Sequence, residues 1–501
     1  MDLDSKTFRE FGYAAIDYVA NYVDTIRERS VLPDVQPGYL SELIPDEIPE
    51  EGEPWTKLME DFDKHIMPGI THWQSPQFHA FFPTGTCYPS MIGELISAAL
   101  GIIGLHWQAS PACTELEVMT MNWLGKLINL PSEFLNCSSG PGGGIIQGSA
   151  SETTFLCLLV AKSKTIKRIK KLHPEMSESE IAGKLVAYTS DQANSSVEKA
   201  GILGSIKMRL LPTGEDGKLL RETLIQVFEN DCNQGLFPCY MVATLGSTGI
   251  CTSDELQVIG PLCEKYNIWL HVDAAYAGAA LVLPECQHLL NGVEHANSFN
   301  FNPHKWLLVN FDCSALWLKN ANDLSEGLAI ERIYLKDNEN VNTQSPEYRN
   351  WQIPLGRRFR ALKLWFTLKS YGKKGLQAFI RHHINLANLF ASLVDQDSRF
   401  ELACPTRLGL VCFRLKGDNK LTEELHNRLM LRRNIYTIVA TVNGQLIIRF
   451  VVCSRLTTEA DINFAWNEIR SQADELLADG GKPQLNGHSL NGANLNGNGH
   501  V

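Results

Sequence analysis

A lysine within a short polar segment has the clearest chemical potential in this sequence. Lys305 lies in the segment Asn302–Trp306, which contains turn-forming residues and lies between two apolar runs. Most lysines are solvated surface groups, and only a partly desolvated lysine, whose pKa is lowered, is a good amine nucleophile toward a carbonyl. The segment therefore makes Lys305 a candidate for Schiff-base formation with a carbonyl compound.

An acidic residue directly follows a second apolar run. Asp273 comes after Ile268–Val272, a run that is typical of a buried strand, and open α/β sheets place ligands at the carboxyl ends of such strands. An isolated aspartate there could merely cap a helix. Beside a Schiff-base lysine it has a specific use, because a carboxylate keeps the pyridine nitrogen of pyridoxal phosphate (PLP) protonated and lets the ring accept electrons.

Glycines and small hydroxyl residues at positions 142–153 precede a helical pattern. Backbone N–H groups at the start of that helix, together with the hydroxyls of Ser149 and Ser151, would bind a phosphate. A glycine-rich turn by itself is a common structural feature, so this motif indicates a phosphate site only in combination with the lysine and the aspartate.

The elements that must position these residues follow a regular rhythm from residue 88 to residue 377. Helical patterns alternate with short apolar strands, for example Leu185–Tyr188 and Ile268–Val272. This rhythm predicts one large α/β domain, which would bind the cofactor, with a mostly parallel sheet. Residues 378–479 predict a small C-terminal α+β domain, with strands at Leu408–Leu415 and Gln445–Val452.

The two ends of the chain differ from this pattern. Residues 1–87 predict an N-terminal helical segment, whose apolar stripe could pack against another domain, a second subunit or an ordinary core. The stripe consists of Phe8, Phe11, Ala15, Tyr18 and Val19. Residues 480–501 repeat Asn-Gly with almost nothing to bury, which predicts a disordered tail.

Composition and charge exclude several classes of protein. The chain has 501 residues, of which 44% are apolar, and its formal net charge of −11 argues against a nucleic-acid partner. Four basic residues are spaced so that they fall on one face of a helix, which predicts a solvated helix face. This group is Lys164, Lys167, Arg168 and Lys171. The 13 cysteines are scattered without a Cys-x-x-Cys pair, and the histidines lack a paired-ligand motif, so we expect free thiols and no metal site.

The sequence also favours a soluble, cytoplasmic protein that does not associate with membranes. The N-terminal residues are acidic and lack the apolar core of a signal peptide. The apolar stretch Met91–Leu105 contains Glu94 and is too short to span a bilayer.

Taken in this order, the elements resemble the group II PLP-dependent decarboxylases, and within them the animal aromatic-L-amino-acid decarboxylases. The resemblance covers nearly everything before the tail and is carried by Thr71–Trp73, Ala109–Glu115, Asn302–Trp306 and Trp351–Phe359. It implies the PLP-dependent aminotransferase-like fold (fold type I), an aromatic L-amino acid as substrate, and a homodimer with its active site at the subunit boundary.

The resemblance also implies roles for individual residues. Lys305 would hold PLP covalently, and Asp273 would pair with the ring nitrogen. The other cofactor-binding residues would be Ser149, Ala150, Ser151, Thr248, Asn302 and His304. The aromatic-substrate pocket would consist of Trp73, Phe81, Phe82, Pro83, Thr84, Ile103 and Leu105. Within this pocket, Thr84 would form a hydrogen bond with a hydroxyl on the substrate ring.

The chain departs from the family at two positions. Asn194 stands where ordinary family decarboxylases have a histidine that stacks on the cofactor ring. That histidine lies between the substrate carboxylate and a mobile-loop tyrosine, which matches Tyr334 here. Imidazole exchanges a proton near neutral pH, whereas the amide of Asn194 does not titrate there. At the second position, Phe81 replaces the usual tyrosine and removes one hydroxyl from the pocket.

The change at position 194 predicts a different product. Losing a general acid-base group typically slows a step by about 10²–10⁴-fold, which is enough to change the fate of the intermediate that remains after carbon dioxide is lost. Slow protonation would leave this carbanionic intermediate exposed to dioxygen as co-substrate, and the resulting imine would hydrolyse to an aldehyde and ammonia, with hydrogen peroxide formed. This pattern resembles the insect 3,4-dihydroxyphenylacetaldehyde synthases, which act on L-dopa, and implies a place in cuticle hardening.

Two alternatives remain open. Tyr334 could protonate the intermediate through water, which would make the chain a slower conventional decarboxylase with dopamine or another arylalkylamine as product. An inactive PLP-binding scaffold would be expected to lack Lys305 or Asp273, and both are present.

Overall fold

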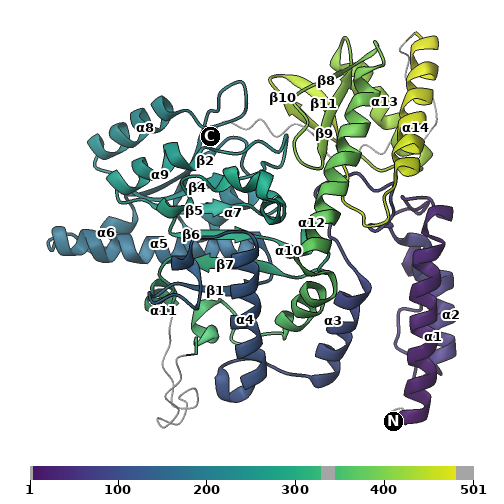
Figure 1. Ribbon diagram of the computed structural model, residues 1–501, viewed down its shortest axis with the longest axis horizontal. Coiled ribbons are helices and arrows are strands. Elements are labelled where there is room, and N and C mark those ends of the chain that lie inside the picture. The colour runs from purple at the N-terminus through teal and green to yellow at the C-terminus, as the bar shows by residue number, and fades with distance from the viewer. Residues whose placement is uncertain (1–3, 329–344, 481–501) are drawn as a thin grey trace.

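The computed structural model describes residues 4–328 and 345–480, which are the described residues from here on. Their strands form one large and one small sheet, and helices pack against both sheets (Figure 1). Tyr334 and residues 481–501 of the predicted tail lie outside the described residues, so these two predictions stay predictions.

The large sheet has seven strands in the order β1-β7-β6-β5-β4-β2-β3. They are β1 (Gly143–Gln147), β2 (Leu185–Ser190), β3 (Lys207–Leu211), β4 (Phe237–Thr244), β5 (Trp269–Asp273), β6 (Ser298–Phe301) and β7 (Ser314–Leu318). β7 is antiparallel to both of its neighbours, β1 and β6, and the remaining neighbouring strands are parallel. The predicted mostly parallel sheet is confirmed.

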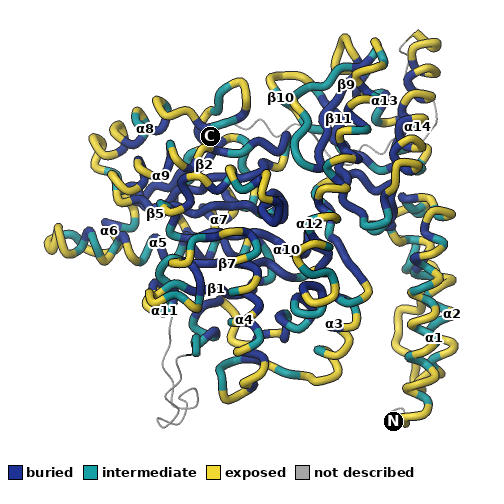
Figure 2. Tube along the Cα trace, viewed as in Figure 1, coloured by how far each residue is buried: buried dark blue, intermediate teal, exposed yellow. Residues whose placement is uncertain are grey.

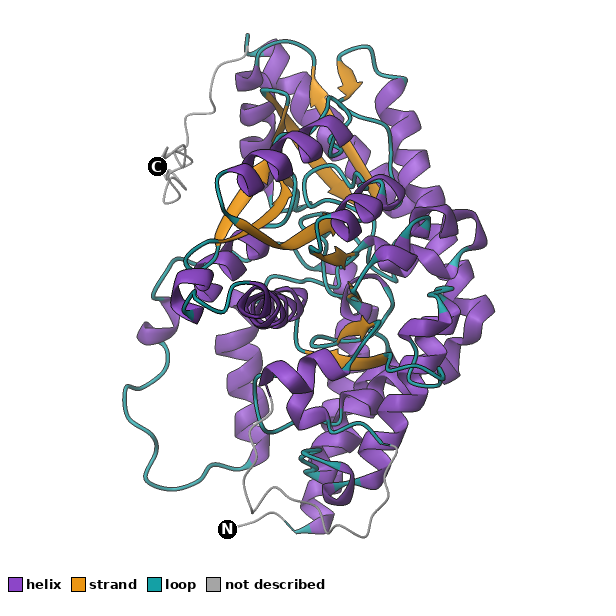
Figure 3. Cartoon of the chain, turned by 90° about the vertical axis from the view of Figure 1, so that its left-hand side faces the viewer, coloured by secondary structure: helices purple, strands orange, loops and turns teal. Residues whose placement is uncertain are grey.

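Helices lie on both sides of this sheet (Figure 3). Because successive residues of a strand point to opposite faces, Leu270 and Val272 of β5 join one core cluster and Trp269 joins the other. The first cluster includes residues of α4 (Pro111–Leu127), α8 (Arg221–Asn233), α9 (Leu256–Lys265), α10 (Pro303–Trp306) and α12 (Arg360–Asp395). The second includes residues of α5 (Ala150–Leu172), α7 (Ser195–Gly204) and α11 (Asn322–Leu328). The short helix α6 (Glu178–Ala182) follows α5.

The small sheet has the strand order β10-β11-β9-β8 and confirms the two strands predicted near the C-terminus. Its elements are β8 (Phe400–Leu402), β9 (Leu410–Leu415), β10 (Ile438–Val442), β11 (Gln445–Val451), α13 (Asn419–Arg432) and α14 (Glu459–Ala478). The long helix α12 joins both sheets, because its residues up to Ile380 pack in the core of the large sheet and those from Leu386 in that of the small sheet. The boundary at residues 377–378 falls within this helix and stays a prediction.

The N-terminal segment is helical, as predicted, and extends beside the rest of the chain (Figure 2). Its helices are α1 (Ser5–Asp24) and α2 (Trp55–Asp61), and α3 (Tyr88–Leu100) follows. Two residues of the predicted stripe pack within the segment: Phe11 stacks on Trp55 at 5.3 Å, and Tyr18 donates a hydrogen bond to Asp63. The other large residues of this stripe, Phe8 and Val19, are exposed.

A buried ion pair joins α4 to the segment before α12. The guanidinium of Arg357 contacts the Glu117 carboxylate, and both side chains are only 1% exposed. The same carboxylate accepts a hydrogen bond from the Ile146 N–H of β1 at 2.7 Å. Removing one partner of a buried pair leaves an uncompensated charge, which costs far more than losing a pair in water.

We therefore expect Glu117→Ala to lower the free energy of unfolding by about 3–5 kcal/mol, measured by urea denaturation. The control is Glu10→Ala, which removes the partner of Lys6 in a solvent-exposed pair with an N–O distance of 3.9 Å. That change should cost less than about 1 kcal/mol. Equal losses in the two variants would show that the buried pair has no special weight in stability.

Three further expectations concern the cysteines, membrane spans and metal sites. All 13 cysteines are free thiols, as predicted. Within the described residues, no helix combines the length and the apolar character that crossing a membrane requires. The same residues contain no group of three or more histidine, cysteine or acidic side chains placed to hold a metal ion.

Candidate active site

A cavity of about 200 Å³ lies where the parallel strands of the large sheet end. Ten predicted site residues line it: Phe82, Ser149, Ala150, Ser151, Asn194, Thr248, Asp273, Asn302, His304 and Lys305. They come from distant parts of the sequence, and the parallel sheet brings them together because its strands end at a common edge. Thr244 and Asp273, at the ends of β4 and β5, are register partners and both line the cavity.

Lys305 and Asp273 provide an amine and a carboxylate in the same buried space. Lys305 lies in the single turn α10 after β6, and desolvation lowers the pKa of its amine, although the Asp273 carboxylate opposes this shift. Burial raises the pKa of Asp273, which Lys305 and the Ala275 N–H partly counter. Lys305 is thus removed from water, as a reactive lysine requires.

The glycine-rich segment ends at the start of α5, as expected for a phosphate-binding turn. The Ser149 hydroxyl caps this helix and accepts a hydrogen bond from the Glu152 N–H at 3.2 Å. Ala150 and Ser151 occupy the first turn, where N–H groups have no partner within the helix and the dipole favours an anion. Both residues line the cavity, so their positions fit a phosphate.

Hydrogen bonds with Ser314 and Cys313 hold the side chains of Asn302 and His304 in place. The Asn302 side-chain oxygen accepts a hydrogen bond from the Ser314 hydroxyl at 2.7 Å. The Nδ1 atom of His304 accepts one from the Cys313 N–H at 2.9 Å. Desolvation, followed by the nearby Lys305 charge, lowers the pKa of His304 to about 3. His304 is therefore neutral around pH 7 and presents no positive charge to the cavity.

Asn194 has both ends of its amide engaged. Its side-chain oxygen accepts a hydrogen bond from the Ser196 N–H at 3.0 Å and caps α7. Its side-chain nitrogen donates to the Thr248 hydroxyl at 3.0 Å. Asparagine is among the best residues for such a cap. A helix-capping role is thus present together with a place in the cavity, and the amide supplies no group that titrates near neutral pH.

Several lining residues were not predicted. They are Ser196, Thr244, Gly246, Ala275 and Tyr276. Thr244 is the last residue of β4 and Ala275 follows β5 closely, so both lie where open α/β sheets place ligands. Nothing in the sequence singled out Tyr276, whose ring stacks on Phe82 at 3.7 Å. Beyond the lining, the buried Arg449 of β11 places its guanidinium 5.1 Å from the centre of the Phe82 ring. This contact joins the small sheet to the site.

The remaining residues of the predicted substrate pocket do not line this cavity. Trp73 and Phe81 stack on each other at 5.7 Å, and both are 41% exposed. Pro83 and Thr84 lie near the site, since the next residue, Gly85, donates its N–H to the His304 carbonyl at 2.8 Å.

Ile103 and Leu105 lie elsewhere on the chain, beside the segment that contains Arg357. Gly104, between them, donates its N–H to the Arg357 carbonyl at 3.0 Å. The Ile103 side chain is 59% exposed. A single chain therefore does not bring these two residues into the cavity that holds Lys305.

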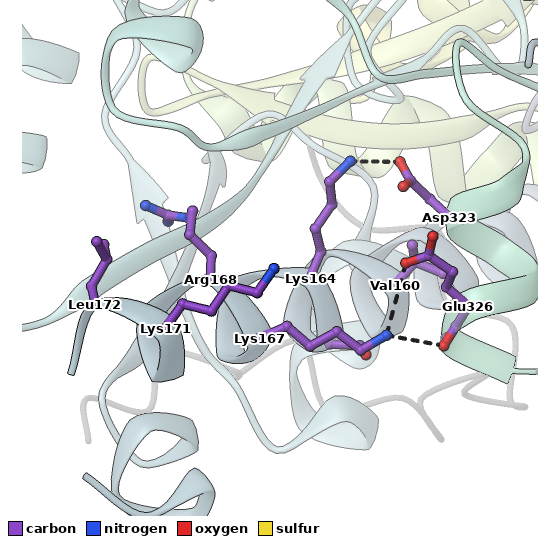
Figure 4. A pocket seen from close by; sticks show the side chains of 10 residues that line it. Val160, Lys164, Lys167, Arg168, Lys171, Leu172, Asp323 and Glu326 are labelled. Atoms are coloured by element: carbon purple, nitrogen blue, oxygen red, sulfur yellow. Dashed lines mark hydrogen bonds and ion pairs between the residues drawn. The ribbon is translucent and has the colours of Figure 1, made fainter. Parts of the chain in front are cut away.

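The predicted basic helix face is confirmed on α5, where it borders a separate cavity of about 400 Å³ (Figure 4). Lys164 forms an ion pair with Asp323 at 2.7 Å, and Lys167 lies 3.9 Å from a Glu326 carboxylate oxygen. These acidic partners belong to α11 and offset two of the positive charges. The face is thus exposed to solvent at Lys164, Lys167 and Lys171, as predicted, and two of these lysines also pair with α11.

Known proteins are similar in sequence to this chain over most of its length. A family model described as pyridoxal-dependent decarboxylase conserved domain matches residues 37–416. A 3,4-dihydroxyphenylacetaldehyde synthase of Aedes aegypti is 54% identical over 95% of this chain and 91% of its own length. An aromatic-L-amino-acid decarboxylase of Drosophila melanogaster is 51% identical over 95% of this chain and 93% of its own.

Solved structures show the same fold. The crystal structure of Oryza sativa TDC with PLP and tryptamine has a TM-score of 0.92 and 33% sequence identity, and the match covers 95% of this chain and 99% of that one. The predicted fold type I architecture, with a large α/β part and a small C-terminal sheet, is confirmed.

Proposed function

This chain belongs to the pyridoxal-dependent decarboxylase family, and on that premise we propose that it makes an aldehyde from an aromatic L-amino acid. The first candidate substrate is L-dopa. The balanced reaction is L-dopa, dioxygen and water to 3,4-dihydroxyphenylacetaldehyde, carbon dioxide, ammonia and hydrogen peroxide. Dioxygen is a co-substrate in this scheme, and PLP is the cofactor.

The cavity residues fit PLP in both charge and position. PLP supplies an electron sink for the electron pair that is left when the substrate loses its carboxylate. Lys305 would bind its aldehyde carbon, and Asp273 would hold a proton on its ring nitrogen. The N–H groups of Ala150 and Ser151 would bind its phosphate, while Ser149, Thr248, Asn302 and His304 complete the wall of the site.

The observation that carries the proposed product is the state of Asn194. Its amide oxygen caps α7 and one of its amide N–H groups donates to Thr248, so these bonds fix the orientation of the side chain. An amide also does not titrate in this pH range. If protonation is slowed by the usual 10²–10⁴-fold range, roughly 3–5 kcal/mol of barrier, oxidation by dioxygen can take place first.

Oxygen uptake tests this proposal. The PLP-loaded protein with L-dopa should consume one dioxygen for each carbon dioxide released, and catalase should halve the net uptake because it returns half of the oxygen from peroxide. Carbon dioxide release without oxygen uptake would contradict an aldehyde synthase.

One observation favours a second candidate function. The chain is 51% identical to an aromatic-L-amino-acid decarboxylase, only slightly less than to the aldehyde synthase of Aedes aegypti. A conventional decarboxylase, with Tyr334 as the proton donor, would release an arylalkylamine and leave dioxygen untouched.

We further propose that the protein is a homodimer. Two helices in the first hundred residues, α1 and α3, carry exposed apolar side chains. They are Phe8, Tyr13, Ile16 and Val19 on α1, and Ile92, Leu95, Ile96 and Leu100 on α3, each at least 38% exposed. An apolar surface of this kind is typical of a subunit interface. In a dimer, the exposed Ile103 could reach the cavity of the neighbouring subunit, as its predicted role requires.

Leu95→Glu should convert the dimer to monomers, observed by sedimentation velocity. Burying a leucine contributes about 1.5–3 kcal/mol, and a symmetric interface contains the residue twice, so the dissociation constant should rise by about 100-fold or more. The matched control is Leu172→Glu, at an exposed leucine at the end of α5. A monomeric wild type, or a dimer that tolerates Leu95→Glu, would argue against this interface.

A further inference from the structure

A buried chain of hydrogen bonds connects two strands of the large sheet to the wall of the cavity. Ser314 is the first residue of β7, the strand that lies between β1 and β6. Asn300 of β6 donates a side-chain N–H to the Ser314 hydroxyl at 2.7 Å. That hydroxyl donates in turn to the side-chain oxygen of Asn302 at 2.7 Å. Each of these three side chains is at most 3% exposed.

The partners of Asn300 fix the direction of this chain. Its side-chain nitrogen also donates to the Ala315 carbonyl at 3.3 Å, and because a carbonyl can only accept, the amide must present its nitrogen here. The Ser314 oxygen therefore accepts from Asn300, and the single hydroxyl proton remains for Asn302. The Asn302 amide thus points its oxygen at Ser314, and its two N–H groups take the opposite end.

The side-chain nitrogen of Asn302 is a buried donor at the edge of the cavity. Asn302 is 3% exposed and lines the cavity together with Ala150 and Ser151. Among the described residues, the Asn302 side chain has a hydrogen-bond partner at its oxygen and none at its nitrogen. A buried N–H without a partner costs free energy unless an acceptor arrives. The nitrogen is therefore suited to an anion that also contacts the start of α5.

We propose that Ser314 is a positioning residue for the phosphate of the cofactor, because it holds the Asn302 amide with its N–H groups toward the cavity. Without the Ser314 hydroxyl, the amide can turn its oxygen toward the phosphate, where one acceptor would face another. The register supports this role: Gln147, the partner of Ser314 on β1, leads into the turn before α5. Ser314 thus contacts both segments that would hold the phosphate. This inference rests on the proposed function, which makes PLP the cofactor.

A comparison of PLP with pyridoxal, which lacks the phosphate, tests this role. Both compounds carry the same aldehyde, so the full-length chain freed of cofactor is titrated with each, and the absorbance of the Schiff base gives the dissociation constant. No amino acid is present, so the result does not depend on the product that the enzyme makes. Ser314→Ala should weaken PLP binding by about 10-fold, as expected for a hydrogen bond to a charged group, and leave pyridoxal binding within about twofold of wild type.

Two further variants set the scale of this effect. Asn302→Leu removes the donor itself and should weaken PLP binding at least as much as Ser314→Ala. The double variant should bind PLP no more weakly than Asn302→Leu alone, because both changes act on one contact. The matched control is Thr120→Ala, which removes another fully buried hydroxyl, one that donates to the Leu116 carbonyl within α4. It should change neither dissociation constant.

The possible outcomes separate this inference from the proposed function. A wild-type chain that binds PLP no more tightly than pyridoxal would contradict the phosphate site itself, and this inference with it. Weaker PLP binding in Asn302→Leu but not in Ser314→Ala would overturn only the positioning role of Ser314. Equal losses for PLP and pyridoxal in Ser314→Ala would overturn that role too, because they would show that Ser314 supports the sheet rather than the phosphate contact.

Discussion

Lys305→Ala should remove the covalent cofactor link and lower the rate of carbon dioxide release by about 10⁴-fold, the upper end for a catalytic group that transfers protons. The reason is local: Lys305 is a desolvated amine near the Asp273 carboxylate, in a cavity that the start of α5 also lines. Borohydride reduction of wild-type protein should fix the cofactor to the peptide that contains Lys305. The variant should show no such adduct.

The control for this experiment is Lys164→Ala, which removes a lysine that pairs with Asp323 at the separate cavity of α5. It should retain both the adduct and the rate. An adduct on another lysine in the Lys305→Ala protein, with turnover maintained, would remove Lys305 from the proposed role.

Asn194→His should shift the product from aldehyde toward amine, by as much as the 10²–10⁴-fold that a general acid contributes, or roughly 3–5 kcal/mol in the competition between protonation and oxidation. An imidazole at this position would face the Thr248 side of the cavity and could exchange a proton near neutral pH. Losing the α7 cap should cost only about 1 kcal/mol of stability. The measurement is the ratio of dopamine to aldehyde formed from L-dopa in air.

Asn194→Gln separates the two roles of this residue, because it disturbs the cap but retains an amide that does not titrate. It should still give aldehyde. If Asn194→His leaves the oxygen-dependent products unchanged, the lack of a titrating group at this position does not determine the product.

Much of the site could be predicted because its residues follow strands or begin a helix. Asp273 ends an apolar run and Lys305 follows another, and parallel strands bring such positions to one edge of a sheet. The same reasoning placed Ser151 at the start of α5. Local sequence was sufficient in these cases because position along a strand fixes position in the sheet.

Other features depend on contacts that no local pattern contains. Arg449 of the small sheet contacts the Phe82 ring. Tyr276, which stacks on the same ring, follows an apolar run whose residues are typical of a core, so its type alone did not indicate a site residue. Both side-chain hydrogen bonds of Asn194, with the Ser196 N–H of α7 and with the Thr248 hydroxyl, required the fold. Ile103 was assigned to the pocket by resemblance, yet within one chain it lies exposed beside the Arg357 segment.

The most direct test of aldehyde formation is a complete product balance for the PLP-loaded protein with L-dopa, in air and with oxygen depleted. Carbon dioxide, dopamine, aldehyde, ammonia and hydrogen peroxide are measured in the same incubation. We predict that aldehyde, ammonia and peroxide each match carbon dioxide in air, and that aldehyde and peroxide disappear without oxygen. Dopamine equal to carbon dioxide under both conditions would contradict this prediction and make the protein a conventional decarboxylase.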